Sequence, residues 1–153
     1  MAILKTGIDE CQGRIEELAD EAREIVNEHW KFHYRENALL APREKGRLNL
    51  WVRLRGSVLE IYWTSFRFAK EEGAPKANVV STYIPKGNGS RYRTRSLAIR
   101  AKGWELEEAL EFEDRMSKIR SEYADVSKAA SLLRRAQKKA AERASTVNDK
   151  ITE

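Results

Sequence analysis

The chain has 153 residues and a formal net charge of +5, with 35% charged and 41% hydrophobic residues. This length allows one domain with a core plus helical extensions, and the high charge favours long, exposed helices over one large globule. No run approaches the ~18 apolar residues that a membrane span needs, so we expect no membrane association. Cys11 is the single cysteine, which excludes an internal disulfide and favours a cytoplasmic protein.

Residues 1–40 are predicted to form a long N-terminal helix. Apolar positions recur at alternating spacings of three and four, which is typical of a narrow coiled-coil seam. The seam consists of Ile8, Cys11, Ile15, Leu18, Ala22, Ile25, His29 and Phe32. We expect the helix to end near Asn37, because Pro42 follows closely. His29 and His33 share one helical face, and we interpret them as a packed pair because the sequence offers no third metal ligand beside them.

Residues 41–102 are predicted to contain a three-stranded antiparallel sheet and a basic turn. In Arg47–Arg55, leucine and valine alternate with polar, basic and aromatic residues, which indicates a strand with one buried face. Gly56-Ser57 suits a two-residue type II′ hairpin turn, and this turn pairs Arg55 with Val58. The turn therefore fixes the register of the whole hairpin.

The returning strand is predicted over Val58–Phe68, and a short third strand over Val79–Ile84. The register places Arg53 opposite Glu60, Trp51 opposite Tyr62 and Asn49 opposite Thr64 on one face, and Leu54 opposite Leu59, Val52 opposite Ile61 and Leu50 opposite Trp63 on the other. The second face is the core face, whereas the first is aromatic, polar and basic. A helical turn is expected near Ser96–Lys102.

Residues 103–145 are predicted to form a second long helix, followed by a flexible tail over 146–153. At 1.5 Å per residue this helix would be about 60 Å long, which is longer than a three-stranded sheet can cover. Part of it should therefore pack against the N-terminal helix or another subunit. The predicted fold class is α+β: a three-stranded antiparallel sheet backed by the C-terminal helix, with the N-terminal helix pairing with it as a coiled-coil-like arm.

The two ends of the second long helix carry opposite charge. The acidic residues near its start are Glu105, Glu107, Glu108, Glu111, Glu113 and Asp114. We interpret them as a solvated helix N-terminus that complements the helix dipole, not as an active site. The basic residues near its end are Arg134, Arg135, Lys138, Lys139 and Arg143. They indicate either favourable charge near a helix C-terminus or a second contact with a DNA backbone.

Positive charge is concentrated in the middle of the chain. Residues 41–102 contain 14 Lys/Arg and 4 Asp/Glu, whereas residues 1–40 and 103–153 have net charges of −4 and −1. No acidic residue occurs from Pro85 to Lys102. A basic segment between acidic or near-neutral flanks is typical of a protein that binds a polyanion. We therefore predict that residues 41–102 form a DNA-binding region.

The outward face of the sheet and the following turn are expected to contact double-stranded DNA. Arginine can form bidentate hydrogen bonds to phosphate oxygens or to guanine edges, and aromatic and small polar groups beside it supply packing and orientation. A narrow sheet can enter the major groove. A Gly-rich turn brings backbone N–H groups close to a phosphate. The residues predicted to make these contacts are Arg47, Trp51, Arg53, Arg55, Tyr62, Thr64, Tyr83, Lys86, Asn88, Arg91, Arg93, Arg95, Arg100 and Lys102.

Other interpretations of the basic region stay open at this point. The charges could lie on a solvated or partner-covered sheet, and aromatic residues on a sheet can also stack RNA bases. The chain could equally be a DNA-binding transcriptional regulator, or a coiled-coil adaptor whose basic middle binds an acidic protein. A homodimer through the helical seams is expected. No nucleophile–base set, metal-ligand set or nucleotide fingerprint occurs, so we expect no enzyme activity, metal or cofactor.

Short motifs near the end of the basic region and in the last helix form a further pattern. They are Ser81–Tyr92, Ala101–Glu105, Phe112-Glu113 and Ile119-Arg120, together with Ile61–Trp63 in the hairpin. These motifs resemble the MobI family, the accessory mobilisation proteins of integrative conjugative elements and related plasmids. The resemblance implies an auxiliary factor that acts at the origin of transfer and helps a relaxase. It implies no catalytic residue in this chain.

Overall fold

The computed structural model describes residues 2–69, 72–73 and 78–152. The helices and strands of this part of the chain are α1 (Ala2–Asn37), β1 (Leu48–Arg55), β2 (Val58–Ala69), β3 (Asn78–Tyr83), α2 (Thr94–Ala98) and α3 (Leu106–Thr152). The strands form one antiparallel sheet in the order β1-β2-β3. The predicted α+β class is therefore confirmed. None of the helices in the described ranges is long and apolar enough to cross a membrane.

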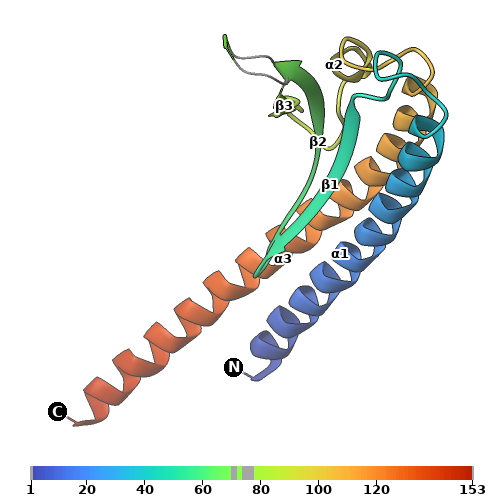
Figure 1. Ribbon diagram of the computed structural model, residues 1–153. Coiled ribbons are helices and arrows are strands. Elements are labelled where there is room, and N and C mark those ends of the chain that lie inside the picture. Colours follow the sequence, from blue (N-terminus) through green and yellow to red (C-terminus); the bar gives the residue numbers. More distant parts are fainter. Residues whose placement is uncertain (1, 70–71, 74–77, 153) are drawn as a thin grey trace.

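The two long helices lie side by side and run antiparallel (Figure 1). Arg14 of α1 donates two hydrogen bonds to Glu122 of α3, at 2.5 and 2.9 Å. Near the start of α1 the helices approach closely, because a Cβ atom on Gly7 would lie only 3.1 Å from Leu133 Cδ1. The apolar seams of the two helices thus face each other within one chain, as predicted for the arm.

The hairpin of β1 and β2 has the predicted register at every pair. Arg55 pairs with Val58, and the pairing continues through Trp51 and Tyr62. Gly56 has a φ of 58°, and no non-glycine residue of the described chain has a positive φ. A positive φ at the first turn position alone is the combination that a type II′ turn requires. The glycine at this position therefore sets which side chains of the hairpin face the core.

The third strand pairs with only part of β2. β3 begins one residue earlier than predicted and forms a ladder with Thr64–Ala69, whereas β1 pairs with Val58–Ser65. Among the described residues, the segment Val58–Trp63 of β2 therefore has a strand neighbour on the β1 side alone. The helical turn expected near 96–102 is present as α2, which begins at Thr94.

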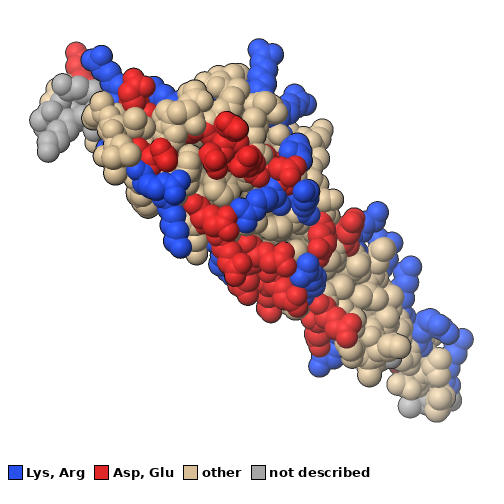
Figure 2. All heavy atoms as spheres, turned by 90° about the vertical axis from the view of Figure 1, so that its right-hand side faces the viewer, with Lys and Arg blue, Asp and Glu red and all other residues tan. Residues whose placement is uncertain are grey.

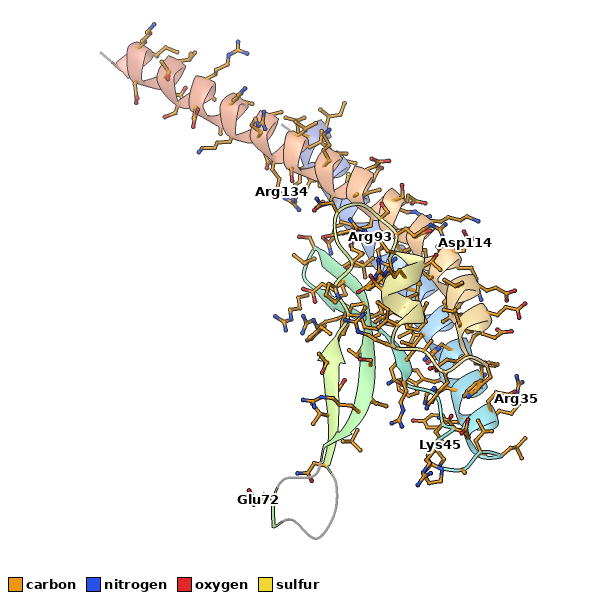
Figure 3. The ribbon with its side chains drawn as sticks, turned by 90° about the horizontal axis from the view of Figure 1, so that it is seen from above. Arg35, Lys45, Glu72, Arg93, Asp114 and Arg134 are labelled. Carbon is orange, nitrogen blue, oxygen red and sulfur yellow. The ribbon has the colours of Figure 1, made fainter. Side chains whose placement is uncertain are left out.

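The inward face of the sheet packs on α1, α3 and α2. Leu50, Ile61 and Trp63 from this face are buried in the same cluster as apolar residues of both long helices. Leu97 of α2 is fully buried in that cluster, which fixes α2 against the core. Seen from above, the two long helices and α2 lie on the same side of the sheet (Figure 3). No helix of the described residues covers the other side of the sheet.

The last helix extends farther than the sequence indicated. Its end was predicted at Ser145, but α3 continues to Thr152. Its alanines and long polar residues have high helix propensity, and no Gly or Pro interrupts it. Gly7 lies beside Leu133 and the two helices are antiparallel, so residues 138–152 of α3 run past Ala2, the first described residue of α1 (Figure 1). We call this segment the overhang.

Glu113, which the sequence suggested was solvated, is buried instead. Its carboxylate accepts hydrogen bonds from Trp63 Nε1 at 3.0 Å, from the Tyr92 backbone N–H at 2.8 Å, and from Arg120 at 2.9 and 3.0 Å. Arg120 also donates to the carbonyl oxygens of Ile61 and Ser90, at 3.1 and 3.0 Å. This buried junction clamps the segment around residues 90–92 between β2 and α3. It thereby positions the arginines on either side of Tyr92.

Glu105, the second acidic residue expected in solvent, is also buried. It accepts hydrogen bonds from the backbone N–H groups of Arg47, Leu48 and Lys102, at 2.8, 3.3 and 2.7 Å. Burial raises the pKa of Glu105, and the three N–H donors oppose that rise. A Cβ atom on Gly46 would lie 2.5 Å from Glu105 Oε2, so this close approach needs glycine. Glu105 thus ties the start of β1 to the segment before α3.

The His29–His33 pair is packed inside the protein, as predicted. Both side chains are buried, and the His29 ring lies 5.4 Å from the Trp63 ring and 5.6 Å from the Phe112 ring. Burial, with a smaller contribution from His33, lowers the pKa of His29 to about 4. His33 Nε2 lies 2.8 Å from Asn37 Nδ2. Within the described ranges, no group of three or more His, Cys, Asp or Glu residues could hold a metal ion.

Candidate nucleic-acid interface

The side of the sheet away from the helices, here called the outer face, collects the predicted aromatic and basic residues of the strands. Strand alternation and the observed register place Trp51, Arg53, Arg55, Tyr62 and Tyr83 on this side. Arg55 and Tyr83 are exposed, and the other three are half-buried. The Trp51 ring also meets the ring of Trp30 in α1, with 5.1 Å between the ring centres. Trp51 is thus packed against a helix, and the outer face offers mainly its guanidinium and tyrosine groups.

Several groups of the outer face already bond to one another. Arg53 Nε donates to Glu60 Oε2 at 2.9 Å, and its guanidinium lies 5.9 Å from the centre of the Tyr62 ring. Trp51 Nε1 donates to Thr64 Oγ1 at 2.8 Å, and Thr64 itself is buried. Thr64 is thus placed to orient Trp51 and does not present its hydroxyl to solvent.

The tyrosines of the outer face form a ring pair beside these groups. The ring centres of Tyr62 and Tyr83 are 5.0 Å apart. Burial, followed by a hydrogen bond to Tyr83, raises the pKa of Tyr62. Tyr62 therefore stays neutral at physiological pH and adds no negative charge that would repel a polyanion. Of the two rings, Tyr83 is 61% exposed and offers the larger apolar area.

Four cations converge at the end of the sheet opposite the hairpin turn. Arg47, Arg67, Arg100 and Lys102 line one shallow depression of about 440 Å³; we call them the end cluster. Glu105 holds the backbone of two members together, because it accepts hydrogen bonds from the N–H groups of Arg47 and Lys102. Arg100 Nη1 donates to the Ser96 carbonyl oxygen at 2.8 Å. The fold thus brings basic groups from three separate segments to one place.

Arg67 is the member of the end cluster that the sequence did not indicate. Alternation along β2 directs it to the helix side of the sheet, together with Trp63, so the pattern suggested no role on the outward surface. Beyond the ends of the long helices, however, that side is lined by residues 99–102. No signal in the sequence shows where the helix cover ends, so only the three-dimensional arrangement reveals Arg67.

The predicted turn residues lie beside the sheet edge and on α2. Gly87 and Gly89 have φ values of 78° and 96°, which lets the turn fold back so that Lys86 bonds to the carbonyl oxygens of both. Asn88 and Arg93 are exposed. The Arg93 guanidinium approaches Gly87, with Nε 3.8 Å from the position of an added Cβ. The turn and the residue that caps α2 therefore form one small basic surface.

Not every predicted contact residue of the turn has its charge available. Arg91 Nη2 donates to Asp114 Oδ1 of α3 at 2.6 Å, and Lys118 pairs with the same carboxylate. These contacts lower the pKa of Asp114. Arg95, the second residue of α2, is exposed. Two arginines of the predicted set, Arg53 and Arg91, are thus engaged with a carboxylate. Within the described residues, no carboxylate pairs with Arg93, Arg95 or Arg100.

Charge is segregated between the faces of the molecule. Figure 2 shows Asp and Glu side chains gathered on the side where α1 and the start of α3 lie. The exposed acidic residues of α1 include Glu17, Asp20, Glu24 and Glu28. Lys and Arg side chains instead stand out along the end of α3 in the same view. The helical side of the molecule thus carries a negative field, whereas the end of α3 is basic.

Comparison with known proteins gives one match. A family model described as MobI protein matches residues 18–134. The matched span begins within α1, includes the whole sheet and α2, and ends within α3 before the overhang. No curated protein and no solved structure matches the chain significantly.

Proposed function

The chain belongs to the MobI family and is thus a mobilisation-related accessory protein, and from this premise we propose that it binds double-stranded DNA at an origin of transfer and helps a relaxase act there. The proposed contacts are the end cluster, the exposed basic residues of the turn and α2, and the outer face. The observation that carries the proposal is the end cluster, where four cations from three separate segments converge on one depression.

The electrostatics of the end cluster support a contact with phosphate. Like charges held close together repel one another unless an anion lies between them. In the described part of the chain, no carboxylate forms an ion pair with Arg67, Arg100 or Lys102. Glu105 lies nearby and offsets one charge, but its oxygens are engaged by backbone N–H groups. A DNA phosphate would supply the missing negative charge, and its position would be fixed by the rigid sheet end.

The outer face supports a further contact with a groove of the duplex. Narrow sheets enter the major groove, where arginine recognises guanine and aromatic or methyl groups contact thymine. Arg55 is exposed at the hairpin end, and Tyr83 is exposed beside Tyr62. We propose that phosphate contacts at the end cluster set the register of the protein and that Arg55, Tyr62 and Tyr83 contact base edges.

A salt titration tests the DNA contact. The triple variant Arg67→Ala, Arg100→Ala, Lys102→Ala should bind a labelled random duplex more weakly, and the slope of log affinity against log salt should fall by about three, roughly one per phosphate contact. The matched control removes three cations from the acidic side of α1: Arg23→Ala, Lys31→Ala, Arg35→Ala. Equal slopes for the two triple variants would mean that the end cluster makes no phosphate contact. No binding at ~50 mM salt would favour the adaptor function instead.

The action at the origin of transfer needs its own experiment. A footprint on the transfer origin of the element that encodes the chain should show a protected site that survives an excess of random duplex. Nicking by the relaxase of the same element should then increase when the chain is added, and the end-cluster triple variant should lose this stimulation. Uniform protection along the DNA would indicate an unspecific binding protein.

We also propose that the chain acts as a homodimer through the overhang. The seam of α3 continues there through Ala140, Ala144, Val147 and Ile151, and Val147 and Ile151 are exposed. A second copy would cover this seam. Sedimentation should give a dimer for the natural chain and a monomer for Val147→Glu with Ile151→Glu. The control Ala141→Glu with Ser145→Glu, which lies off the seam, should remain a dimer.

A further inference from the structure

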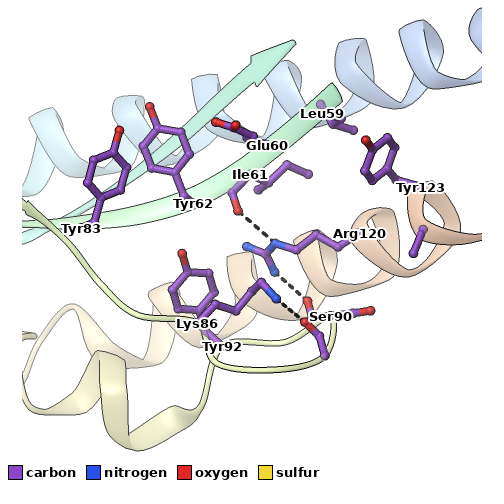
Figure 4. A pocket seen from close by; sticks show the side chains of 12 residues that line it. Leu59, Glu60, Ile61, Tyr62, Tyr83, Lys86, Ser90, Tyr92, Arg120 and Tyr123 are labelled. Atoms are coloured by element: carbon purple, nitrogen blue, oxygen red, sulfur yellow. Dashed lines mark hydrogen bonds between the residues drawn. The ribbon is translucent and has the colours of Figure 1, made fainter. Parts of the chain in front are cut away.

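A groove of about 580 Å³ opens beside the part of β2 that has no strand on one side (Figure 4). The edge of β2 from Leu59 to Tyr62 forms one wall, and Tyr123 with Ala124 of α3 forms the other. The turn from Lys86 to Tyr92 closes one end. The groove is thus bordered by a strand edge on one side and by a helix on the other.

The backbone of β2 directs hydrogen-bonding groups into this groove. In a hairpin with a two-residue loop, Val58 and Glu60 direct their N–H and C=O groups to β1, so Leu59, Ile61 and Trp63 direct theirs to the groove. Arg120 Nε donates to the Ile61 carbonyl oxygen at 3.1 Å, and the Trp63 N–H donates to Tyr92 Oη at 3.2 Å. Ile84 N donates to the Trp63 carbonyl oxygen at 3.0 Å. Among the described residues, these contacts leave the N–H and C=O of Leu59 and the N–H of Ile61 for another partner, because the β3 ladder begins only at Thr64.

We propose that this groove binds an extended peptide segment of another protein, which adds a short strand to the open edge of β2. Main-chain hydrogen bonds to Leu59 and Ile61 would supply the affinity, and alternate side chains of the peptide would supply specificity. The volume lies within the range of ligand sites. Apolar peptide side chains would pack against Leu59, Ile61 and Tyr123.

Charge at the groove selects an acidic residue in that peptide. Lys86 lines the groove, and within the described residues its ammonium group bonds to the carbonyl oxygens of Gly87 and Gly89 and forms no ion pair. Glu60, the acidic residue of the lining, is paired with Arg53. The local field is therefore positive, and a carboxylate beside Lys86 would be stabilised. The peptide class that fits alternates apolar residues and carries one Asp or Glu.

The geometry favours a single strand over other partners. The edge of β2 lies between α3 and the turn, so the same edge of a second copy, recessed behind its own α3, could not reach it. A DNA duplex is wider than one strand and would meet the outer face before the groove. The inference thus goes beyond the proposed DNA contact and concerns a different surface.

The test selects peptides against the full chain and then blocks the groove. A phage-displayed library of random seven-residue peptides is selected on the chain, and the enriched peptides are synthesised. We expect alternating apolar residues with one acid, and shifts of the Leu59 and Ile61 backbone amide signals in nuclear magnetic resonance spectra. Ala124→Trp, which fills the groove from the exposed wall of α3, should weaken binding at least tenfold. The control Ala129→Trp, exposed on the same helix but outside the lining, should leave it unchanged.

Backbone methylation of the peptide and a nucleic-acid probe complete the test. N-methylation of the peptide at alternate residues should abolish binding, because it removes the N–H donors while keeping the side chains. No enriched peptide, or peptides that bind Ala124→Trp as well as the natural chain, would overturn the proposal. Oligothymidylate serves as the nucleic-acid probe. If it shifted the Leu59 and Ile61 amide signals of the natural chain and its complex were lost in Ala124→Trp, the groove would be a nucleic-acid site, and the peptide proposal would also be overturned. Duplex binding by Ala124→Trp is measured in parallel, so that failure of the peptide proposal can be distinguished from failure of the DNA proposal.

Discussion

The buried junction around Glu113 and the end cluster are both rich in charged groups, yet they differ in what those charges meet. At the junction, one carboxylate receives two bonds from Arg120 and two from neutral donors, and both side chains are almost fully buried. In the end cluster, cations line an open depression, and the carboxylate of Glu105 beside them bonds to backbone N–H groups. The number of charges is thus a poor guide to an interface, whereas burial and pairing separate structural charges from available ones.

The two regions also depend on each other. The junction holds the segment around Tyr92, and the chain then passes through α2 to residues 99–102 of the end cluster. A buried ion pair contributes little net stability relative to an apolar replacement, but breaking it leaves an unpaired buried charge. We therefore expect the junction to act as an anchor. Breaking it should affect the proposed DNA surface only indirectly, by destabilising the fold that positions this surface.

The largest expected effect comes from breaking the junction. Glu113→Ala leaves the Arg120 guanidinium buried without its carboxylate and should lower the free energy of unfolding by about 3–5 kcal/mol. Urea unfolding followed by circular dichroism measures the change. Glu111→Ala, exposed on the same helix, should change stability by less than about 0.5 kcal/mol. If both variants unfold at the same urea concentration, the junction is not an anchor.

The second prediction separates geometry from charge in the end cluster. Glu105→Ala removes the acceptor of three backbone N–H groups and should lower the free energy of unfolding by about 2–3 kcal/mol. It also makes the cluster more positive, so an effect of charge alone would strengthen duplex binding. We expect weaker binding instead, because Arg47 and Lys102 lose the contact that holds their backbones together. Tighter binding by this variant would show that net charge, not the arrangement, governs affinity.

The third prediction concerns pH and the buried side of the molecule. The folded protein keeps His29 neutral, with a pKa of about 4 against the ordinary value of 6.5 for histidine. Below pH 6.5 the His29 imidazole binds a proton in the unfolded chain but not in the folded one. The free energy of unfolding therefore falls as pH decreases from about 6.5 towards 4. His29 alone should lower the free energy of unfolding by about 2 kcal/mol between pH 7 and pH 5.

A variant with no ionisable group at this position isolates the effect. His29→Phe keeps an aromatic ring among Trp63 and Phe112 and should reduce the loss of stability between pH 7 and pH 5, measured by urea unfolding at each pH. The raised pKa of Glu105 acts in the opposite direction in both proteins and so cancels in the comparison. Identical pH dependence of the natural chain and the variant would exclude His29 as the titrating group.

Local patterns predicted much of the fold but less of the interface. Alternation along β1 and the glycine of the turn determine the register, because a shift of one residue would turn Leu50 and Trp63 away from the core. The motifs that resemble MobI proteins likewise lie within the matched span. Burial of Glu105 and Glu113 was not predicted, since a run of acids at a helix start has the same composition whether exposed or buried. Their roles depend on backbone groups of distant segments, which leave no local signal.

The smallest expected effect converts an engaged arginine into an available one. Glu60→Gln breaks the charge pair with Arg53. The side chains of Arg53 and Glu60 are 37% and 39% exposed. Exposed pairs contribute roughly 0–1 kcal/mol, so the free energy of unfolding should fall by less than about 1 kcal/mol. Duplex affinity at low salt should rise a few-fold, because a negative charge leaves the outer face and the Arg53 guanidinium becomes free to meet a phosphate. The control Glu111→Gln removes the same charge from α3 and, at the same low salt concentration, should raise affinity by a clearly smaller factor, because its charge lies away from the outer face. Equal gains from the two variants would show that the outer face responds only to net charge and does not touch DNA.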